Sequence, residues 1–265
     1  MCSSDLVLLI LFAAPVFLEC VLGALILGGA WEWSALAGLT TPLHRRVFVA
    51  AMAGSMALAA LMAGPGSAAL APLLLASGIG WIAAGAAVLA YPRGTAVWGS
   101  VPGRLLLGLF VLIPPWAALL YLRSLPHGEW LLLFCIVLIA FVDIGAFFAG
   151  RSIGGPKLMP TVSPAKTWSG FCGGLLCSMM LAVAVAAGTG VAAQRFWLWM
   201  FVCFSTALAA VVGDLLESML KRYSGIKDSG SLLPGHGGLF DRLDSLTAGL
   251  PVFALGTLLA GGFSA

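Results

Sequence analysis

Long apolar stretches recur along the chain, and short polar segments separate them. Each stretch is close to the length of about 20 residues that a helix needs to cross the hydrocarbon core of a bilayer. We predict eight spans, at residues 17–39, 47–63, 70–90, 105–122, 130–149, 170–187, 196–213 and 246–263. A shorter apolar piece, Leu6 to Ala14, is either the remnant of a ninth span or an extension of the first. The pattern predicts an all-α, polytopic transmembrane helix bundle of eight to nine spans.

Composition supports a membrane location and excludes several other classes. Hydrophobic residues make up 61% of the chain and charged residues only 9%, whereas soluble domains are about a quarter charged. A net charge of +3, with no basic stretch interleaved with aromatic residues, argues against nucleic-acid binding. The six cysteines form no CxxC pair, so neither a zinc site nor a disulfide framework is indicated.

Basic residues are divided unequally between the two sides of the predicted bundle. Only Arg123 and Arg195, of 13 Lys and Arg residues, fall in one set of alternate loops. Loops rich in Lys and Arg face the cytosol, which predicts that segments 40–46, 91–104, 150–169 and 214–245 are cytosolic and that the C-terminus is outside. Tryptophans near predicted span ends are typical of interfacial belts: Trp31, Trp33, Trp81, Trp98, Trp116, Trp130 and Trp168.

Two of the predicted cytosolic segments, 150–169 and 214–245, are long, polar and rich in glycine, and we expect function to lie there. We divide the chain into an N-terminal transmembrane region, 1–125, for scaffold and dimerisation, and a C-terminal catalytic region, 126–265, that carries both loops. No internal repeat is visible, so the sequence gives no support to an inverted-repeat transporter.

Carboxylates gather in the C-terminal region. Asp143 lies inside a predicted span and Asp214 at the end of another, and a charge within a span costs about 2.5–3.5 kcal/mol, so it needs a partner or a metal. Asp214 and Glu217 are three residues apart, as are Asp241 and Asp244, and this spacing places each pair on one face of a helix. Spacing alone leaves two interpretations open: oxygen ligands for Mg²⁺, or structural salt bridges with Lys221, Arg222 and Arg242.

Two glycine-rich segments could hold phosphate groups. One runs from Gly154 through Lys157 to Ser163 and Lys166; its backbone amides and lysines suit phosphate oxygens, although the lysines could equally face lipid headgroups. It is not a P-loop, because Pro156 stands where the lysine must follow. The second is His236-Gly237-Gly238, just before a helix start predicted near Leu239, where phosphate can approach the positive helix end. A histidine in a turn can also be an ordinary surface residue.

The second segment lies in a stretch that points to a family. Residues 218–222, 227–230 and 233–244, ending Leu239-Phe240-Asp241-Arg242-Leu243-Asp244, closely resemble the signature of the phosphatidate cytidylyltransferase (CDP-diacylglycerol synthase) family of bacterial type. Residues 143–151, 157–170 and 213–218, and the tripeptide Trp31-Glu32-Trp33, look like further family blocks. Ser169 departs from the Glu or Gln of many members, and the start of the chain looks truncated compared with theirs.

The resemblance implies a function. The enzyme would join CTP and phosphatidic acid into CDP-diacylglycerol and release pyrophosphate, by metal-assisted attack of the lipid phosphate on the α-phosphorus. It also implies Mg²⁺, with room for a second cation, contact with membrane lipids, a homodimer, and a multi-pass protein of the bacterial inner membrane with its active site on the cytosolic side.

On the matched positions we predict three sets of site residues. The metal ligands are Asp214, Asp241 and Asp244. The catalytic set comprises Lys221, Arg222, Lys227, Asp228, His236 and Arg242. The substrate-binding set comprises Asp143, Lys157, Ser163, Lys166, Gly237 and Gly238.

Two other functions are compatible with parts of the pattern. A CTP-dependent lipid kinase of the polyprenol type would transfer the γ-phosphate instead. A membrane transporter also carries intramembrane acids, but those should lie near the middle of spans, whereas here they lie at the predicted cytosolic ends and in a loop.

Overall fold

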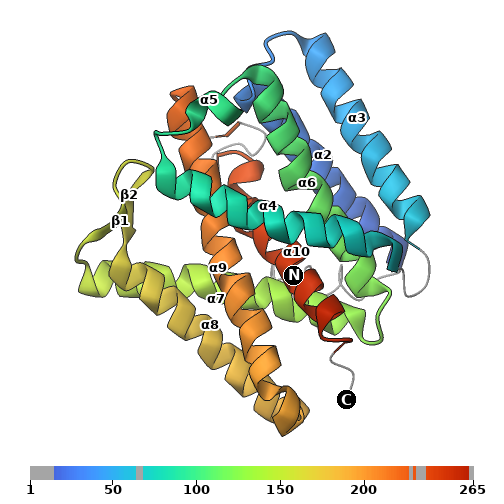
Figure 1. Cartoon of the computed structure of the whole chain (residues 1–265), viewed down its shortest axis with the longest axis vertical. Coiled ribbons are helices and arrows are strands. Elements are labelled where there is room, and N and C mark those ends of the chain that lie inside the picture. The colour runs from blue at the N-terminus through green and yellow to red at the C-terminus, as the bar shows by residue number, and fades with distance from the viewer. Residues whose placement is uncertain (1–14, 64–67, 227–228, 231–236, 263–265) are drawn as a thin grey trace, which may run out of the picture.

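The structure is a computed structural model that describes residues 15–63, 68–226, 229–230 and 237–262. A helix overlaps each of the eight predicted spans, and Figure 1 shows how the helices are arranged. In chain order the elements are α2 (Pro15–Leu36), α3 (Pro42–Met62), η1 (Ala68–Leu70), α4 (Ala71–Ala90), α5 (Thr95–Trp98), α6 (Val101–Arg123), α7 (Gly128–Ile153), β1 (Lys157–Met159), β2 (Ser163–Thr167), α8 (Trp168–Thr189), α9 (Ala193–Ser224), η2 (Phe240–Arg242) and α10 (Asp244–Leu259).

The chain is all-α and polytopic, as predicted. Within the described residues, six helices are long and apolar enough to cross a membrane: α3, α4, α6, α7, α8 and α9. Helix α10 is also apolar but has only 16 residues, and α2, with 22 residues, is not among the six. The count of eight to nine spans therefore stays a prediction, and Leu6 to Ala14 lies outside the described residues.

Local sequence sets where the helices begin. The hydroxyls of Thr41, Ser100 and Thr167 each accept a hydrogen bond from a backbone N–H in the first turn of α3, α6 and α8, respectively. These caps satisfy donors that a helix start leaves without an intrahelical partner. Proline in the first turn of α3, α4 and α6 adds to the effect, because it lacks the N–H that would be unpaired there.

Helices α6 and α10 hold the bundle together. Helix α6 is the most buried of the six candidate spans. In its apolar 18-residue stretch 61% is buried inside the protein, against 22–44% for the other five. Helix α10 packs against α4 and α6 on one side and against α7 and α9 on the other. In Figure 1 it runs through the middle of the molecule, between α2, α3 and α6 and the group formed by α7, α8 and α9. The proposed regions 1–125 and 126–265 thus share a packed boundary, and their separate roles stay a prediction.

The tryptophans of the predicted aromatic belts differ in burial. Trp33, Trp81 and Trp116 are buried, whereas Trp130 and Trp168 are more than half exposed. The indole N–H of Trp33 donates to the carbonyl of Arg104, and that of Trp116 to the carbonyl of Met56. A carbonyl inside the bundle thus satisfies the indole of Trp33 and of Trp116, and the interfacial position of the tryptophans stays a prediction.

The described residues of both predicted cytosolic segments include regular secondary structure. In the first, β1 and β2 form an antiparallel hairpin that pairs Lys157 with Thr167 and Met159 with Ser163. The second does not begin at 214, because α9 continues to Ser224. Beyond residue 213, where the predicted span ends, α9 still buries apolar side chains at helical spacing: Leu215, Leu216, Met219 and Leu220. Burial on one face is enough to keep the helix going.

Candidate metal and phosphate site

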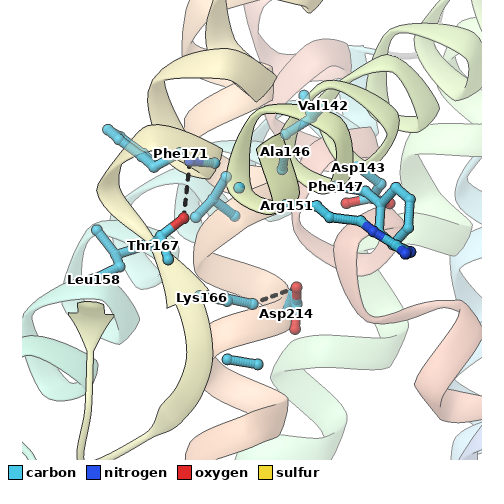
Figure 2. A pocket seen from close by; sticks show the side chains of 14 residues that line it. Val142, Asp143, Ala146, Phe147, Arg151, Leu158, Lys166, Thr167, Phe171 and Asp214 are labelled. Atoms are coloured by element: carbon cyan, nitrogen blue, oxygen red, sulfur yellow. Dashed lines mark hydrogen bonds and ion pairs between the residues drawn. The ribbon is translucent and has the colours of Figure 1, made fainter. Parts of the chain in front are cut away.

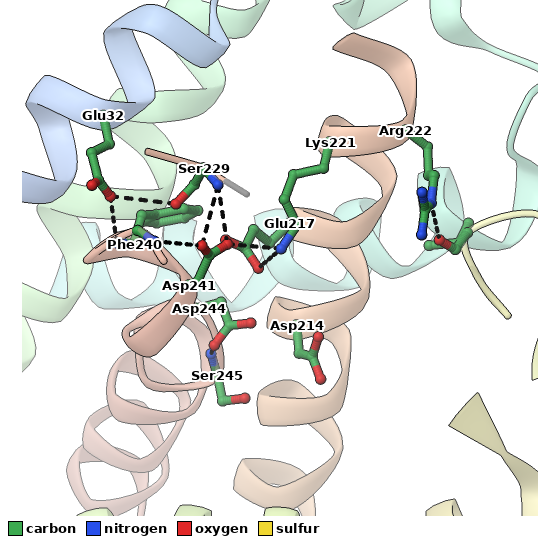
Figure 3. A network of polar contacts seen from close by, with 12 residues as sticks. Glu32, Asp214, Glu217, Lys221, Arg222, Ser229, Phe240, Asp241, Asp244 and Ser245 are labelled. Carbon is green, nitrogen blue, oxygen red and sulfur yellow. Dashed lines mark hydrogen bonds and ion pairs between the residues drawn. The ribbon is translucent and has the colours of Figure 1, made fainter. Parts of the chain in front are cut away.

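Three carboxylates meet where α9 passes the start of α10. Asp214 and Glu217 on α9 and Asp244 at the first position of α10 each offer an oxygen, and these oxygens lie within 4.8 Å of one another. Figure 3 shows all three side chains in the space between the two helices. Glu217 is almost fully buried, at 2% exposure. Three converging carboxylate oxygens are a donor set suited to a hard divalent cation, so this group, the acidic trio, fits a metal.

Close approach of the two helices creates the trio. Asp214 and Glu217 are nearly one turn apart on α9, which places them on the same face. A Cβ atom at Gly213 would lie less than 3.0 Å from the backbone carbonyl oxygen of Asp244, so only glycine lets α10 start this near to α9. The Asp244 carboxylate accepts a hydrogen bond of 2.7 Å from the N–H of Ser245, which orients its side chain.

Asp241 lies beside the acidic trio and has its own partners. It accepts hydrogen bonds from Lys221 Nζ at 2.8 Å, from the N–H of Gly238 at 2.9 Å and from the N–H of Ser229 at 3.2 Å. Burial raises the pKa of Asp241, but hydrogen bonds with Glu217, Lys221 and the Gly238 N–H outweigh that effect and hold the pKa below its usual value. An ionised Asp241 thus fixes Lys221 and the glycine segment next to the trio.

The network combines both interpretations that spacing left open. Lys221 pairs with Glu217 and with Asp241, and Lys166 pairs with Asp214. These two lysines face four carboxylates, those of the acidic trio and of Asp241. The network therefore holds four acidic side chains and two lysines, an excess of acids that suits the binding of a cation.

A cavity of about 410 Å³ adjoins the acidic trio. It lies between α7, β2, α8 and α9, and most of its wall is apolar, with Val142, Phe147 and Phe171 among the lining residues (Figure 2). The charged residues of the wall are Asp143, Arg151, Lys166 and Asp214. Asp214 and its partner Lys166 belong to both the cavity and the acidic network, so a molecule in the cavity would reach the carboxylates directly.

The remaining predicted residues are placed as follows. Lys157 is exposed at the start of β1, and Ser163 begins β2. Arg222 donates through Nε to the carbonyl of Val162 at 3.3 Å, which ties α9 to the turn of the hairpin. Arg242 ends η2, and Gly237 adopts a left-handed backbone with φ of 83°.

Three predicted residues, Lys227, Asp228 and His236, lie outside the described part of the chain. Ser169, the departure from the family pattern, hydrogen bonds to the carbonyl of Gly154 and to Thr167 Oγ1. Its hydroxyl therefore has a structural role at the start of α8.

The predicted site missed two buried acids. Spacing pairs Glu217 with Asp214, but the predicted ligands do not include Glu217. The structure places Glu217 in the acidic trio, and Asp241 lies beside the trio. Glu32, on α2, reaches the same network by accepting a hydrogen bond from the N–H of Phe240 at 2.8 Å. The signal that could have found Glu32 is the one that singled out Asp143, a carboxylate within a predicted span.

Comparisons with known proteins identify the family of the chain. The chain matches the family model described as "Cytidylyltransferase family" over residues 3–259. It is 42% identical over 249 residues to a phosphatidate cytidylyltransferase of Pseudomonas aeruginosa, which covers 94% of this chain and 90% of that protein. It is 38% identical over 258 residues to the protein of the same name from Haemophilus influenzae, with 91% and 89% covered. The resemblance seen in the sequence is confirmed: this chain belongs to the cytidylyltransferase family.

Proposed function

We propose that this chain is a phosphatidate cytidylyltransferase, which makes CDP-diacylglycerol from CTP and phosphatidic acid and releases pyrophosphate. The two relatives bear this name, and the match covers most of their length. The observation that carries the proposal is the acidic trio placed against a mainly apolar cavity inside a bundle of membrane-length helices. A lipid that carries a phosphate needs apolar surroundings for its tails, and a nucleoside triphosphate needs charged ones, so the two can meet at such a junction.

The reaction is difficult because both reactants are anions. A phosphatidate oxygen forms a bond to the α-phosphorus of CTP, and the bond from that phosphorus to the bridging oxygen of pyrophosphate breaks. The attacking phosphate is already ionised at neutral pH, so no strong general base is required. The protein must instead reduce repulsion and hold the reactants in line.

Asp214, Glu217 and Asp244 would hold Mg²⁺, and the bound ion would supply positive charge to the CTP phosphates. Asp241 accepts a hydrogen bond of 2.8 Å from Lys221 Nζ and so holds this ammonium group beside the acidic trio. Lys166 extends from β2 between the cavity and Asp214, where its ammonium group can meet the lipid phosphate. A second cation, and roles for Arg222 and Arg242 at the phosphates, remain part of the prediction.

Orientation, assembly and location belong to the proposal as well. We place the acidic trio at the cytosolic face of a bacterial inner membrane, because the basic loops flank it and because CTP is a cytosolic solute. A homodimer is expected from the family resemblance.

Purified protein in detergent, supplied with phosphatidic acid and CTP labelled at either the α- or the γ-phosphate, tests the reaction. We expect the α-label, and not the γ-label, to enter the lipid, and only when Mg²⁺ is present. Transfer of the γ-label would identify a lipid kinase instead, and no incorporation of either label would leave the proposed reaction without support.

A further inference from the structure

We propose that Glu32 is a positioning residue for the acidic centre: its buried carboxylate on α2 anchors the segment that carries Asp241 and Asp244 to their place opposite α9. This inference rests on the proposed function. It concerns a residue of the N-terminal region, about 200 positions away in sequence from the carboxylates that it would position.

Glu32 contacts that segment at Phe240 and a second stretch of the chain at Ser229. Its Oε2 atom accepts a hydrogen bond of 2.8 Å from the N–H of Phe240 and one of 3.3 Å from the hydroxyl of Ser229, as Figure 3 shows. Glu32 itself is only 2% exposed. A buried carboxylate is stabilised by charge-assisted hydrogen bonds, so this contact joins α2 firmly to the start of η2.

Packing around the carboxylate fixes the same segment. A Cβ atom at Gly230 would lie less than 3.0 Å from Glu32 Oε1, which means that the backbone comes as near as glycine permits. The next residue on α2, Trp33, meets the ring of Phe240 edge to face, with centroids 5.1 Å apart. Phe240 is 1% exposed, so its backbone and its side chain are both held by α2.

From this anchor two short connections lead to the acidic centre. Phe240 is the first residue of η2, Asp241 follows it directly, and Asp244 begins α10 four residues after Phe240. Ser229, which donates its hydroxyl to Glu32, donates its N–H to Asp241 at 3.2 Å. Loss of the Glu32 carboxylate would therefore release the backbone of Phe240, directly before Asp241. It would also release Ser229, whose N–H donates to the Asp241 carboxylate.

Glu32 acts through these groups and not on the reactants. It is not a member of the acidic trio, and it does not line the cavity. Residues that orient metal ligands typically change metal affinity or activity about 10–100-fold when they are replaced. We expect an effect of that size on cation binding, in addition to any effect on stability.

The test compares Glu32→Ala with Glu32→Gln, whose amide oxygen can still accept from Phe240. Glu19→Gln is the matched control: it removes a carboxylate from the same helix, about 20 Å away along its axis. Mn²⁺ alone serves as the probe, titrated into purified full-length protein and followed by electron paramagnetic resonance. Turnover at varied Mg²⁺ is measured in parallel.

We expect Glu32→Ala to weaken Mn²⁺ binding at least about tenfold, to raise the half-saturating Mg²⁺ concentration equally, and to lower kcat. Glu32→Gln should recover most of the loss, and Glu19→Gln should match wild type. If folded Glu32→Ala binds Mn²⁺ and turns over like wild type, the inference is overturned.

If Glu32→Ala does not fold, Ser229→Ala and Glu32→Asp, whose carboxylate is one methylene short of the Phe240 N–H, decide the matter. Wild-type Mn²⁺ affinity in both would mean that Glu32 serves stability alone, whereas weakened affinity in either folded variant supports the positioning role. Failure of the proposed function looks different: wild-type protein would bind Mn²⁺ yet form no CDP-diacylglycerol.

Discussion

The acidic centre and the adjoining cavity differ in almost every physical respect, although Asp214 and Lys166 belong to both. In the acidic centre, carboxylates from α9, η2 and α10 are held by hydrogen bonds and ion pairs of 2.7–3.2 Å. The cavity has a volume of about 410 Å³, and apolar side chains from α7, α8 and α9 form most of its wall, with few charges.

This difference suggests a division of work. A centre built from charge can bind cations and phosphates and lower the barrier of a reaction between anions. A cavity with a mainly apolar wall can bind a lipid, but most of its side chains cannot stabilise the charges of the reaction. Variants in the first should change metal dependence and kcat, and variants in the second should change KM for phosphatidate.

Asp244→Asn should have the largest effect. It removes one of the three anionic donors and leaves an amide of the same size, so we expect turnover to fall about 1,000-fold, equivalent to about 4 kcal/mol of barrier. CDP-diacylglycerol formation from α-labelled CTP is the measurement. Glu129→Gln, a carboxylate change in the first turn of α7, is the control, and wild-type turnover by Asp244→Asn would remove the metal assignment.

Glu217→Gln and Asp241→Asn separate the two kinds of acid in the centre. We expect Glu217→Gln to raise the half-saturating Mg²⁺ concentration about 10–100-fold, because Glu217 is one of the trio. Asp241→Asn should lower kcat by a similar factor with a smaller change in Mg²⁺ dependence, because its contacts are to Lys221 and backbone N–H groups. Equal shifts in Mg²⁺ dependence would place Asp241 among the ligands.

Arg151→Gln tests the cavity. The Arg151 guanidinium belongs to the cavity wall and lies 5.9 Å from the ring centroid of Phe147. We expect KM for phosphatidate to rise about tenfold, because one charge-assisted contact to a phosphate is worth about 1.4 kcal/mol or more, while kcat stays nearly constant. Arg93→Gln, which alters another exposed arginine, should leave both constants unchanged. A loss confined to kcat would contradict the division of work.

Val211→Phe should have the smallest effect. The larger side chain would occupy part of the cavity from α9, so we expect KM for phosphatidate to rise about threefold, equivalent to about 0.6 kcal/mol, with no change in Mg²⁺ dependence. Leu176→Phe, on an exposed face of α8, is the control for added bulk. Dose–response curves for phosphatidate in mixed micelles provide the measurement, and an altered Mg²⁺ requirement would argue against separate regions.

The sequence predicted the helices well because each long apolar run has one favourable outcome in a bilayer. It failed where a tertiary contact replaces hydropathy as the deciding factor. The continuation of α9 depends on burial of Leu215 and Met219, and Trp33 is buried because the carbonyl of Arg104, 71 residues away, accepts its N–H.

The site shows the same limit. Charge and the family resemblance predict carboxylate ligands at 214, 241 and 244, but they do not predict the geometry that groups Asp214 and Asp244 with Glu217. Spacing pairs Asp241 with Asp244 on one helix face, whereas the structure places Asp241 in η2 and Asp244 at the start of α10. Partners as distant in sequence as Glu32 and Phe240 leave no periodic signal, so only the fold brings them together.

The 32-residue length of α9 sets the depth at which the reaction would occur. At 1.5 Å per residue the helix is about 48 Å long, well beyond a hydrocarbon core of about 30 Å. Asp214 then lies about 32 Å from its first residue. For a helix close to the membrane normal, that is the level where acyl chains give way to headgroups. A lipid could therefore present its phosphate to the carboxylates while its tails stay in the leaflet.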